Sequence, residues 1–209
     1  MYAHAISLIR ASKPAAWLAV ALLAGCATTP KNAVDLPDIS TWELRQQVLG
    51  DVEYWQFRGR IAVKAGDEGF NAKFNWTQNG ENFDATVSGP LGVGKVLIEG
   101  DGNRIVLTDK DGEKMVLDNP EADLWYRYGW TIPVNSLRFW ALGIPDPGVR
   151  AVTEFDEAGR LAHMEQSRWR VDISRYREAA GQIMPRTLTA TNPDTRVRMV
   201  IDRWIFFER

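Results

Sequence analysis

The sequence predicts a mainly β protein with some helix: a strongly curved antiparallel sheet of about ten strands with three helical insertions. Three observations lead to this fold class. Apolar and polar residues alternate over successive segments, short turn signals separate these segments, and proline-bounded stretches with helical spacing interrupt them. Because strands joined by short turns cannot run parallel, the sheet is expected to be antiparallel.

Alternation with a period of two residues marks the individual strands. It runs through residues 55–64 and again through 70–77, with one face apolar and the other polar. Asn79-Gly80 then predicts a hairpin turn. Further strands are expected at residues 83–87, 104–108, 114–117, 152–155, 161–166, 168–173, 187–191 and 197–207.

Three stretches carry helical signals instead. Residues 40–43 have the spacing of a capping box, with Ser40 as the cap, and the helix that follows is expected to end at Gly50. A second short helix is expected over residues 120–128. A third is expected over residues 133–142, because proline suits a first helical turn and glycine, here residue 143, suits a C-terminal cap.

Composition narrows the classes of function. Of the 209 residues, 45% are hydrophobic, so the chain can bury a full core. A formal charge of −2 gives no basic footprint for nucleic acid. The single cysteine excludes an intrachain disulfide and a cysteine-based zinc site, and two histidines leave little for metal chemistry. We therefore expect no metal, no cofactor and no nucleic-acid partner.

The first 25 residues are typical of a secretory signal peptide. Two basic residues, Arg10 and Lys13, precede an apolar run at residues 15–24. As a helix this run would span about 15 Å, too short to cross a bilayer. It leads into Cys26 through small residues, which looks like a bacterial lipobox; an ordinary signal peptide with a chance cysteine is the alternative.

Lipidation would account for the unpaired cysteine. Resemblance to bacterial lipoproteins implies that Cys26 carries a thioether-linked diacylglycerol and an N-acyl chain, which together would fix the protein to a bilayer. Ala27, where an aspartate would favour the inner membrane, favours the outer one. The predicted domains are a signal peptide (1–25), a lipidated tether (26–39) and one folded domain (40–209).

Candidate catalytic residues are few. His163 is the one histidine of the mature chain, and an ordinary strand histidine is the favoured interpretation. The acidic residues lie mostly in turns, where solvation explains them better than paired-carboxylate catalysis. The glycine-rich segment 89–94 lacks the ending of a phosphate-binding loop. We therefore expect no enzyme activity.

Two features remain as candidate binding sites. The predicted inner face is rich in large rings and thioethers, which either line a cavity for a hydrocarbon ligand or simply fill the core. The residues considered for an acyl-chain cavity are Trp55, Phe57, Phe74, Trp76, Phe83, Met115, Trp140 and Trp169. The second feature is Leu91, flanked by Pro90 and Gly92, which either presents its side chain to a membrane or folds onto the core.

Four stretches resemble the LolB family of outer-membrane lipoproteins. The most specific is Ile132-Pro133-x-Asn135-Ser136-Leu137-Arg138-x-Trp140-x-Leu142-Gly143. Gly59-Arg60, Pro90-Leu91-Gly92 and Asp202-x-Trp204 agree in the expected order. Together with Cys26, the match covers nearly the whole mature sequence.

The resemblance implies an open, incomplete antiparallel β-barrel of about ten to eleven strands, capped by short helices that enclose an apolar cavity. It implies a monomeric receptor, anchored by Cys26 at the periplasmic face of the outer membrane. Such a receptor takes triacylated lipoproteins from the periplasmic carrier LolA and inserts them among the outer-membrane lipids without nucleotide.

The same resemblance gives Leu91 the insertion step. Pro90, Gly92 and Val93 complete this membrane-insertion loop, although Val93 departs from the family pattern. Two other functions stay open. One is a structural outer-membrane lipoprotein that scaffolds an assembly and has no lipid-binding cavity; the other is a lipid-modifying hydrolase that uses His163.

Overall fold

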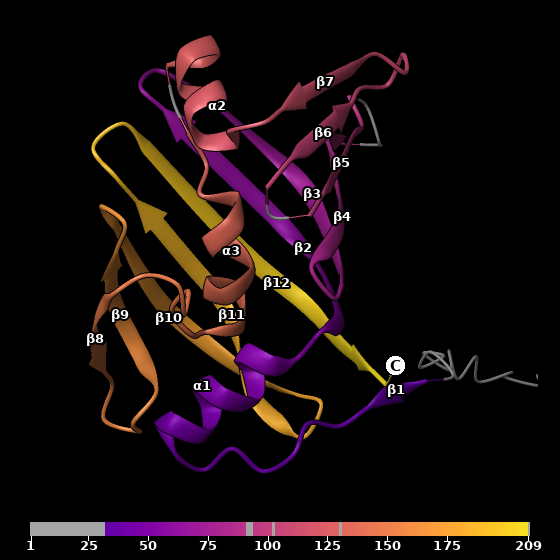
Figure 1. Cartoon of the computed structure of the whole chain (residues 1–209). Helices are drawn as coiled ribbons and strands as arrows, with labels where there is room; N and C mark the ends of the chain where they lie inside the picture. The colour runs from indigo at the N-terminus through magenta and orange to yellow at the C-terminus, as the bar shows by residue number, and fades with distance from the viewer. Residues whose placement is uncertain (1–31, 91–93, 102, 130, 209) are drawn as a thin grey trace, which may run out of the picture. The chain divides into compact units, whose positions relative to one another are not determined.

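The computed structural model describes residues 32–90, 94–101, 103–129 and 131–208 (Figure 1). The strands are β1 (Ala33–Val34), β2 (Tyr54–Ala65), β3 (Glu68–Asn79), β4 (Asn82–Ser88), β5 (Val96–Gly100), β6 (Ile105–Thr108), β7 (Lys114–Leu117), β8 (Ala151–Phe155), β9 (Leu161–Gln166), β10 (Trp169–Ala179), β11 (Gln182–Thr191) and β12 (Thr195–Phe207). The helices are α1 (Trp42–Asp51), α2 (Pro120–Tyr128) and α3 (Val134–Leu142).

All of these strands belong to one antiparallel sheet. Its order is β7-β6-β5-β4-β3-β2-β12-β11-β10-β9-β8, and the short β1 pairs with β12 beside this path. Two meanders, β2–β7 and β8–β12, are joined where β2 pairs with β12. Within the described residues β7 and β8 do not pair, so the sheet stays open. The predicted open antiparallel fold is confirmed, with twelve strands instead of ten or eleven.

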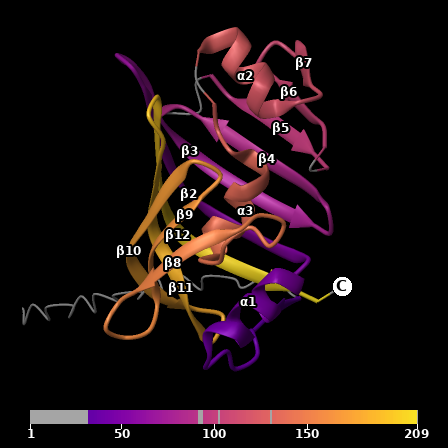
Figure 2. The ribbon, with the colours of Figure 1, turned by 60° about the vertical axis from the view of Figure 1, so that its left-hand side comes forward.

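The sheet curves around the three helices, which lie on its concave side (Figures 1 and 2). α3 packs against β11 and α1, whereas α2 packs against β7 at the other end of the sheet. Among the described helices, none is both long enough and apolar enough to cross a membrane. The concave side between these helices and the strands is therefore where a binding site is sought.

The folded unit begins earlier than the sequence predicts. Residues 26–39 are expected as a tether, but β1 pairs with the end of β12. The amide of Leu36 donates to the β10–β11 turn (2.9 Å), and Leu36 and Ile39 are buried. The prediction is wrong for residues 33–39, because their apolar side chains gain more from burial than from solvation. Residues 1–31 lie outside the described residues.

The helix ends follow the sequence signals with one shift. α1 is capped by Thr41, whose Oγ1 accepts a hydrogen bond from the amide of Leu44 (3.2 Å). The predicted capping box on Ser40 is wrong by one residue, and the shift places Leu44, which cannot return the bond, at the third helical position. α2 has the predicted bounds, and α3 ends at Gly143 in the left-handed conformation (φ 78°), as predicted.

β10 and β11 are longer than predicted. They continue past the expected segments 168–173 and 187–191, and they meet in a turn where Ala180 and Gly181 have φ values of 51° and 71°. Arginines at outward positions and a proline within β11, Pro185, interrupt the pattern that the sequence reading follows. A charged outer face therefore conceals strand alternation even where the inner face is regular.

Gly59 lets the two meanders approach at the centre of the sheet. A Cβ atom on Gly59 would lie 2.2 Å from the carbonyl oxygen of Val200 on β12, so a larger residue would push the strands apart.

Around this junction a cluster of rings covers the inner face, with neighbouring centroids 4.2 to 6.4 Å apart. Its members are Trp55, Phe57, Phe74, Trp76, Phe83, Trp204 and Phe206.

Candidate functional site

An apolar cavity of about 200 Å³ lies on the concave side of the sheet. All of its lining side chains are hydrophobic: Ile61, Phe70, Phe74, Trp76, Val87, Val96, Ile98, Ile105, Leu107, Leu117, Leu124, Ile132, Val134 and Leu137. The one side-chain nitrogen among them, Trp76 Nε1, donates to Gln78 Oε1 (2.9 Å). The lining therefore presents no side-chain polar group in need of a partner, and water gains little by entering.

Two layers of the fold build this cavity. Alternate residues of β2 to β7 point inward and form its floor, because successive side chains of a strand face opposite sides. Leu124 of α2 and Val134 and Leu137 of α3 cover the floor, and Ile132 contributes from the segment that leads into α3. Most of these side chains are branched aliphatic residues, a lining suited to hydrocarbon.

The ring residues predicted for an acyl-chain cavity divide between the cavity and its surroundings. Phe74 and Trp76 line it. Trp55, Phe57 and Phe83 are buried in the ring cluster next to it. Their contact with an acyl chain stays a prediction.

The remaining predicted residues lie elsewhere. Met115 is half-buried on β7 and packs against the core. Trp140 and Trp169 are buried together on the β9–β10 side, with ring centroids 6.1 Å apart. They contribute to the packing under α3 and not to the cavity lining described above.

Sequence reasoning missed the aliphatic part of the lining. Ile98 on β5, Ile105 and Leu107 on β6 and Leu117 on β7 supply most of the floor at that end. These short strands carry continuous apolar runs, at residues 96–98, 105–107 and 115–117, so the sequence indicates burial but not which side chains face inward. The predicted set of rings and thioethers therefore includes Phe74 and Trp76 but none of these aliphatic residues.

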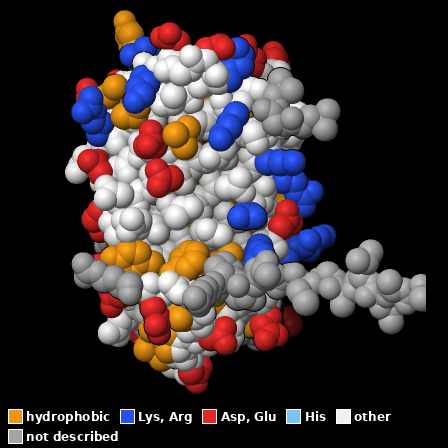
Figure 3. All heavy atoms as spheres, turned by 90° about the vertical axis from the view of Figure 1, so that its right-hand side faces the viewer, with side chains coloured by type: hydrophobic (Ala, Val, Ile, Leu, Met, Phe, Trp, Pro, Cys, Tyr) orange, Lys and Arg blue, Asp and Glu red, His pale blue; other side chains and the backbone are white. Residues whose placement is uncertain are grey.

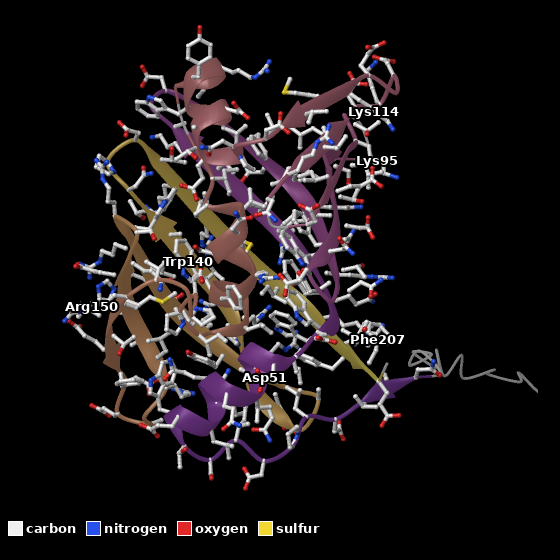
Figure 4. All side chains as sticks on the ribbon, viewed as in Figure 1. Asp51, Lys95, Lys114, Trp140, Arg150 and Phe207 are labelled. Carbon is white, nitrogen blue, oxygen red and sulfur yellow. The ribbon has the colours of Figure 1, made fainter. Side chains whose placement is uncertain are left out.

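A satisfied polar cluster holds the other side of α3. The amide oxygen of Gln166 on β9 accepts from Trp140 Nε1 (2.8 Å) and from the backbone of Asp146 (2.9 Å). Its nitrogen donates to the carbonyl oxygens of Asp146 (2.9 Å) and Val149 (2.7 Å). Ser136 also donates to the Asp146 carboxylate (2.9 Å). Trp140, labelled in Figure 4, belongs to α3, and through it this cluster fixes the helix to the sheet.

Arg138 makes a second tie between α3 and the sheet. Its guanidinium lies 4.5 Å from the ring centre of Phe139 and forms an ion pair with Glu81 at the β3–β4 turn (3.3 Å). The motif that includes Asn135 and Ser136 thus positions α3 over the inner face. Asn135, Ser136 and Arg138 are not part of the cavity lining.

The side chain of Arg45 on α1 reaches the C-terminal end of α3. Arg45 donates to the carbonyl oxygen of Leu142 (3.2 Å), and burial lowers the pKa of its guanidinium. Tyr176 on β10 donates to the carbonyl oxygen of Leu161 (2.5 Å). Burial raises the pKa of Tyr176 to about 12, and the charge of Arg45 opposes that rise in part.

The candidates for catalysis form no catalytic arrangement. His163 Nδ1 lies 3.0 Å from the Asp172 carboxylate, and no hydroxyl or thiol of the described residues is hydrogen-bonded to the ring. Within the same residues, no three His, Cys, Asp or Glu side chains gather as a metal site would require. Asp172 therefore orients the histidine on the strand, as expected for a structural role.

The predicted loop and anchor are only partly described. Pro90 is exposed at the start of the loop. Leu91, Gly92 and Val93 lie outside the described residues, and so does Cys26. Their roles stay predictions.

A protein-family model described as "Outer membrane lipoprotein LolB" matches residues 53–204. The chain belongs to the LolB family. That stretch runs from the start of β2 into β12, so it includes both meanders and all lining residues of the cavity. The family predicted from the sequence motifs is confirmed.

Individual relatives agree with this membership. The "Outer-membrane lipoprotein LolB" of Nitrosococcus oceani is 34% identical over 188 residues, covering 90% of this chain and 94% of the relative. That of Pseudomonas aeruginosa is 31% identical, covering 89% and 92%. Among solved structures, a LolA superfamily protein from Nitrosomonas europaea has a TM-score of 0.53 at 9% identity, over 82% of this chain and 96% of that one. At 9% identity, this likeness shows that the two proteins share a fold and shows nothing about a shared function.

Proposed function

We propose that this LolB-family protein is an outer-membrane receptor that accepts triacylated lipoproteins from a periplasmic carrier, LolA, and inserts them into the inner leaflet. The observation that carries the proposal is the wholly apolar cavity between the helices and β2–β7. Acyl chains are ligands that such a lining suits, since they have no polar atoms to leave unpaired. The names of the relatives support the membrane assignment.

The volume of the cavity supports a receptor that widens as it binds. About 200 Å³ lies below the range of about 300 to 1,000 Å³ typical of ligand pockets, so three acyl chains need more room. The free edge at β7 provides a route, because no further strand holds β5–β7 and α2 in the described residues. Outward movement of this end would enlarge the cavity without breaking the β2–β12 junction.

Transfer without nucleotide requires each acceptor to bind the acyl chains better than the previous one. The cavity stabilises them through buried apolar area, at about 25 cal/mol per Å². The bilayer buries the whole of each chain and is the final acceptor. The protein needs no cofactor for this, and no catalytic step is part of the proposal.

Two elements outside the described residues complete the proposed mechanism. The diacylglycerol and N-acyl chain on Cys26 would hold the protein at the periplasmic face of the outer membrane. Leu91, which follows Pro90 in the sequence, would enter the bilayer and let the cargo leave the cavity. Val93 would share the apolar surface of this loop.

Cargo transfer tests the proposal directly. The chain from residue 27 onward, without its anchor, is mixed with LolA that carries a triacylated lipoprotein, and the cargo is followed by size-exclusion chromatography. The expected result is that the lipoprotein moves to this protein. Failure to move, with both proteins folded, would contradict the receptor and favour a scaffold without a lipid-binding role.

A charged residue in place of Leu91 tests whether acceptance of the cargo and its insertion into the membrane depend on different parts of the protein. Leu91→Glu should accept cargo as wild type does but insert it slowly into vesicles, because a carboxylate resists entry into hydrocarbon. Val152→Glu is the matched control, since Val152 is exposed on β8 (61%) far along the sheet. Equal insertion rates for Leu91→Glu and the control would contradict the role of the loop.

A further inference from the structure

The outer face of the sheet is rich in arginine and lysine. Outward positions on β2, β3, β10, β11 and β12 carry Arg58, Arg60, Lys64, Lys73, Arg175, Arg177, Arg186, Arg196 and Arg198. Lys and Arg side chains gather along the right margin of Figure 3, on the outer side of the sheet. This basic surface contrasts with the formal charge of −2 for the whole chain.

Several of these cations are placed directly against one another. Arg60 pairs across the strands with Lys73, and Lys64 pairs with Arg196. Like charges that are directly opposite in a sheet are destabilising. Among the described residues, only Asp202 relieves this group by an ion pair, with Arg60 (3.3 Å). A face that repels itself in this way is suited to an anion that neutralises it.

The cations converge on one groove. It has a volume of about 530 Å³, and the basic residues among its lining are Arg60, Lys73, Arg175, Arg186 and Arg198. Among the described residues of this lining there is no carboxylate. The adjoining hollow at the β2–β3 turn includes acidic residues, so the acid-free surface is confined to the groove.

Arg186 gives the groove an unsatisfied donor. The residue is half-buried on β11, and its Nε is shielded from solvent without a hydrogen-bond partner among the described residues. A buried donor without an acceptor is costly. Guanidinium groups bind phosphate through two parallel N–H···O bonds, so a phosphate beside Arg186 would supply acceptors for this group.

We propose that this groove binds the phosphate of anionic phospholipid headgroups. Pro90 lines the groove at its edge, and it begins the loop that the proposed function places at the membrane. The choice of a lipid over other anions rests on that function. Headgroup binding on the outer face would hold the protein against the leaflet while the cavity, on the opposite face, stays open to cargo.

Vesicle sedimentation tests the proposal with the chain from residue 27 onward, which keeps the whole described unit and lacks the anchor. Vesicles of phosphatidylcholine alone are compared with vesicles of equal parts phosphatidylcholine and phosphatidylglycerol. The expected result is binding to the second kind, weakened by salt because the attraction is electrostatic. Equal binding to both kinds would overturn the proposal.

The groove variant is Lys73→Gln with Arg198→Gln, two exposed positions. Binding should fall roughly tenfold or more, since each basic residue near an anionic surface contributes about a fivefold factor. The denaturation midpoint should be unchanged or higher, because Lys73→Gln removes the repulsion with Arg60. Arg150→Gln with Arg168→Gln is the matched control, with the same loss of charge at exposed positions near β8 and β10 (Figure 4 labels Arg150). Equal weakening in both variants would overturn the groove as the site.

Two further measurements identify the ligand. Arg186→Lys keeps the charge but removes the planar fork, so weaker vesicle binding supports phosphate recognition at this residue. Inorganic phosphate should compete only weakly with vesicles; full competition at equal phosphate would mean a free anion site and overturn the lipid assignment.

Lipoprotein acceptance from LolA in solution should be normal for the groove variant. Lost acceptance with intact vesicle binding would assign the groove to an acidic protein surface instead, whereas lost acceptance by wild type would contradict the proposed function alone.

Discussion

The two ends of the concave side are built on the same plan but differ in what fills them. Over β2–β7, beneath α2 and the start of α3, branched aliphatic side chains surround a cavity. Over β8–β11, beneath α1 and α3, tryptophans fill the space and Gln166 uses both atoms of its amide to hold α3. One end has an apolar cavity, which the proposed function assigns to acyl chains, and the other end holds α3 against the sheet.

This difference indicates which end of the concave side contributes more to the free energy of unfolding. At the packed end, buried rings and the fully paired amide of Gln166 hold α3 against the sheet. At the hollow end α2 exposes Trp125 (51%) and Tyr126 (91%), and contacts the sheet mainly through β7. We expect substitutions at the packed end to reduce the stability of the fold and those at the hollow end to change what it binds.

The largest expected effect follows from removing Trp140. Trp140→Ala should lower the free energy of unfolding by about 3–5 kcal/mol, since it opens a cavity in the core and leaves Gln166 without one partner. Trp125→Ala on α2 is the control and should change it by less than about 1 kcal/mol. Urea denaturation measures both. Similar losses would show that the two ends do not differ in this way.

Tyr176 makes the packed end sensitive to high pH. Its pKa of about 12 in the fold exceeds the ordinary value near 10, so the unfolded chain releases this proton first. Its contribution, about 2–3 kcal/mol by the size of the shift, is fully present below pH 10 and is lost as the pH rises from 10 to 12. Denaturation at several alkaline pH values should show this fall, and Tyr176→Phe should make it shallower. An identical slope in the variant would contradict the assignment.

The cap of α1 has a smaller effect. Thr41→Ala should reduce the free energy of unfolding by about 1 kcal/mol, because the amide of Leu44 loses its acceptor. Ser40→Ala, one residue earlier, should have almost no effect. The two variants compared by thermal denaturation decide between Thr41 and the predicted cap at Ser40, and a larger loss for Ser40→Ala would reverse the assignment.

The smallest change in stability should come from filling the cavity. Ile98→Phe adds volume where space exists, so we expect a change within about 1 kcal/mol. Uptake of an apolar fluorescent probe should nevertheless fall severalfold. Ile183→Phe, at an exposed position on β11, is the matched control and should take up probe as wild type does. Unchanged uptake in Ile98→Phe would mean that the probe binds elsewhere.

Much of the fold could be predicted because one side of each strand is buried. Alternation located most strands, and Pro120, Gly143 and their neighbours set the bounds of α2 and α3. The position of the β3–β4 turn was predicted one residue too early. Asn79 pairs with Asn82, so the hairpin centres on Gly80 and Glu81 and not on Asn79 and Gly80. A glycine next to an asparagine permits either turn, and only the register of the flanking strands selects one.

The site could be predicted in kind but not in position. Large rings indicated an apolar interior, yet which rings line a cavity depends on how tightly the sheet curves, which no local pattern records. The packing of residues 33–39 also depends on partners far along the chain, at the β10–β11 turn and the end of β12. The basic groove was missed because its five cations come from five different strands, which only the folded sheet brings together.

The place of β12 in the sheet has a consequence for biosynthesis. The strand that joins the two meanders, β12 (Thr195–Phe207), follows all the other described strands in the chain, so its 13 residues are synthesised after theirs. Until they emerge, β2 and β11 each lack a partner along one edge, and the nascent chain has two incomplete sheets in place of one. A chain that ends before Thr195 would expose both edges and should aggregate or be degraded.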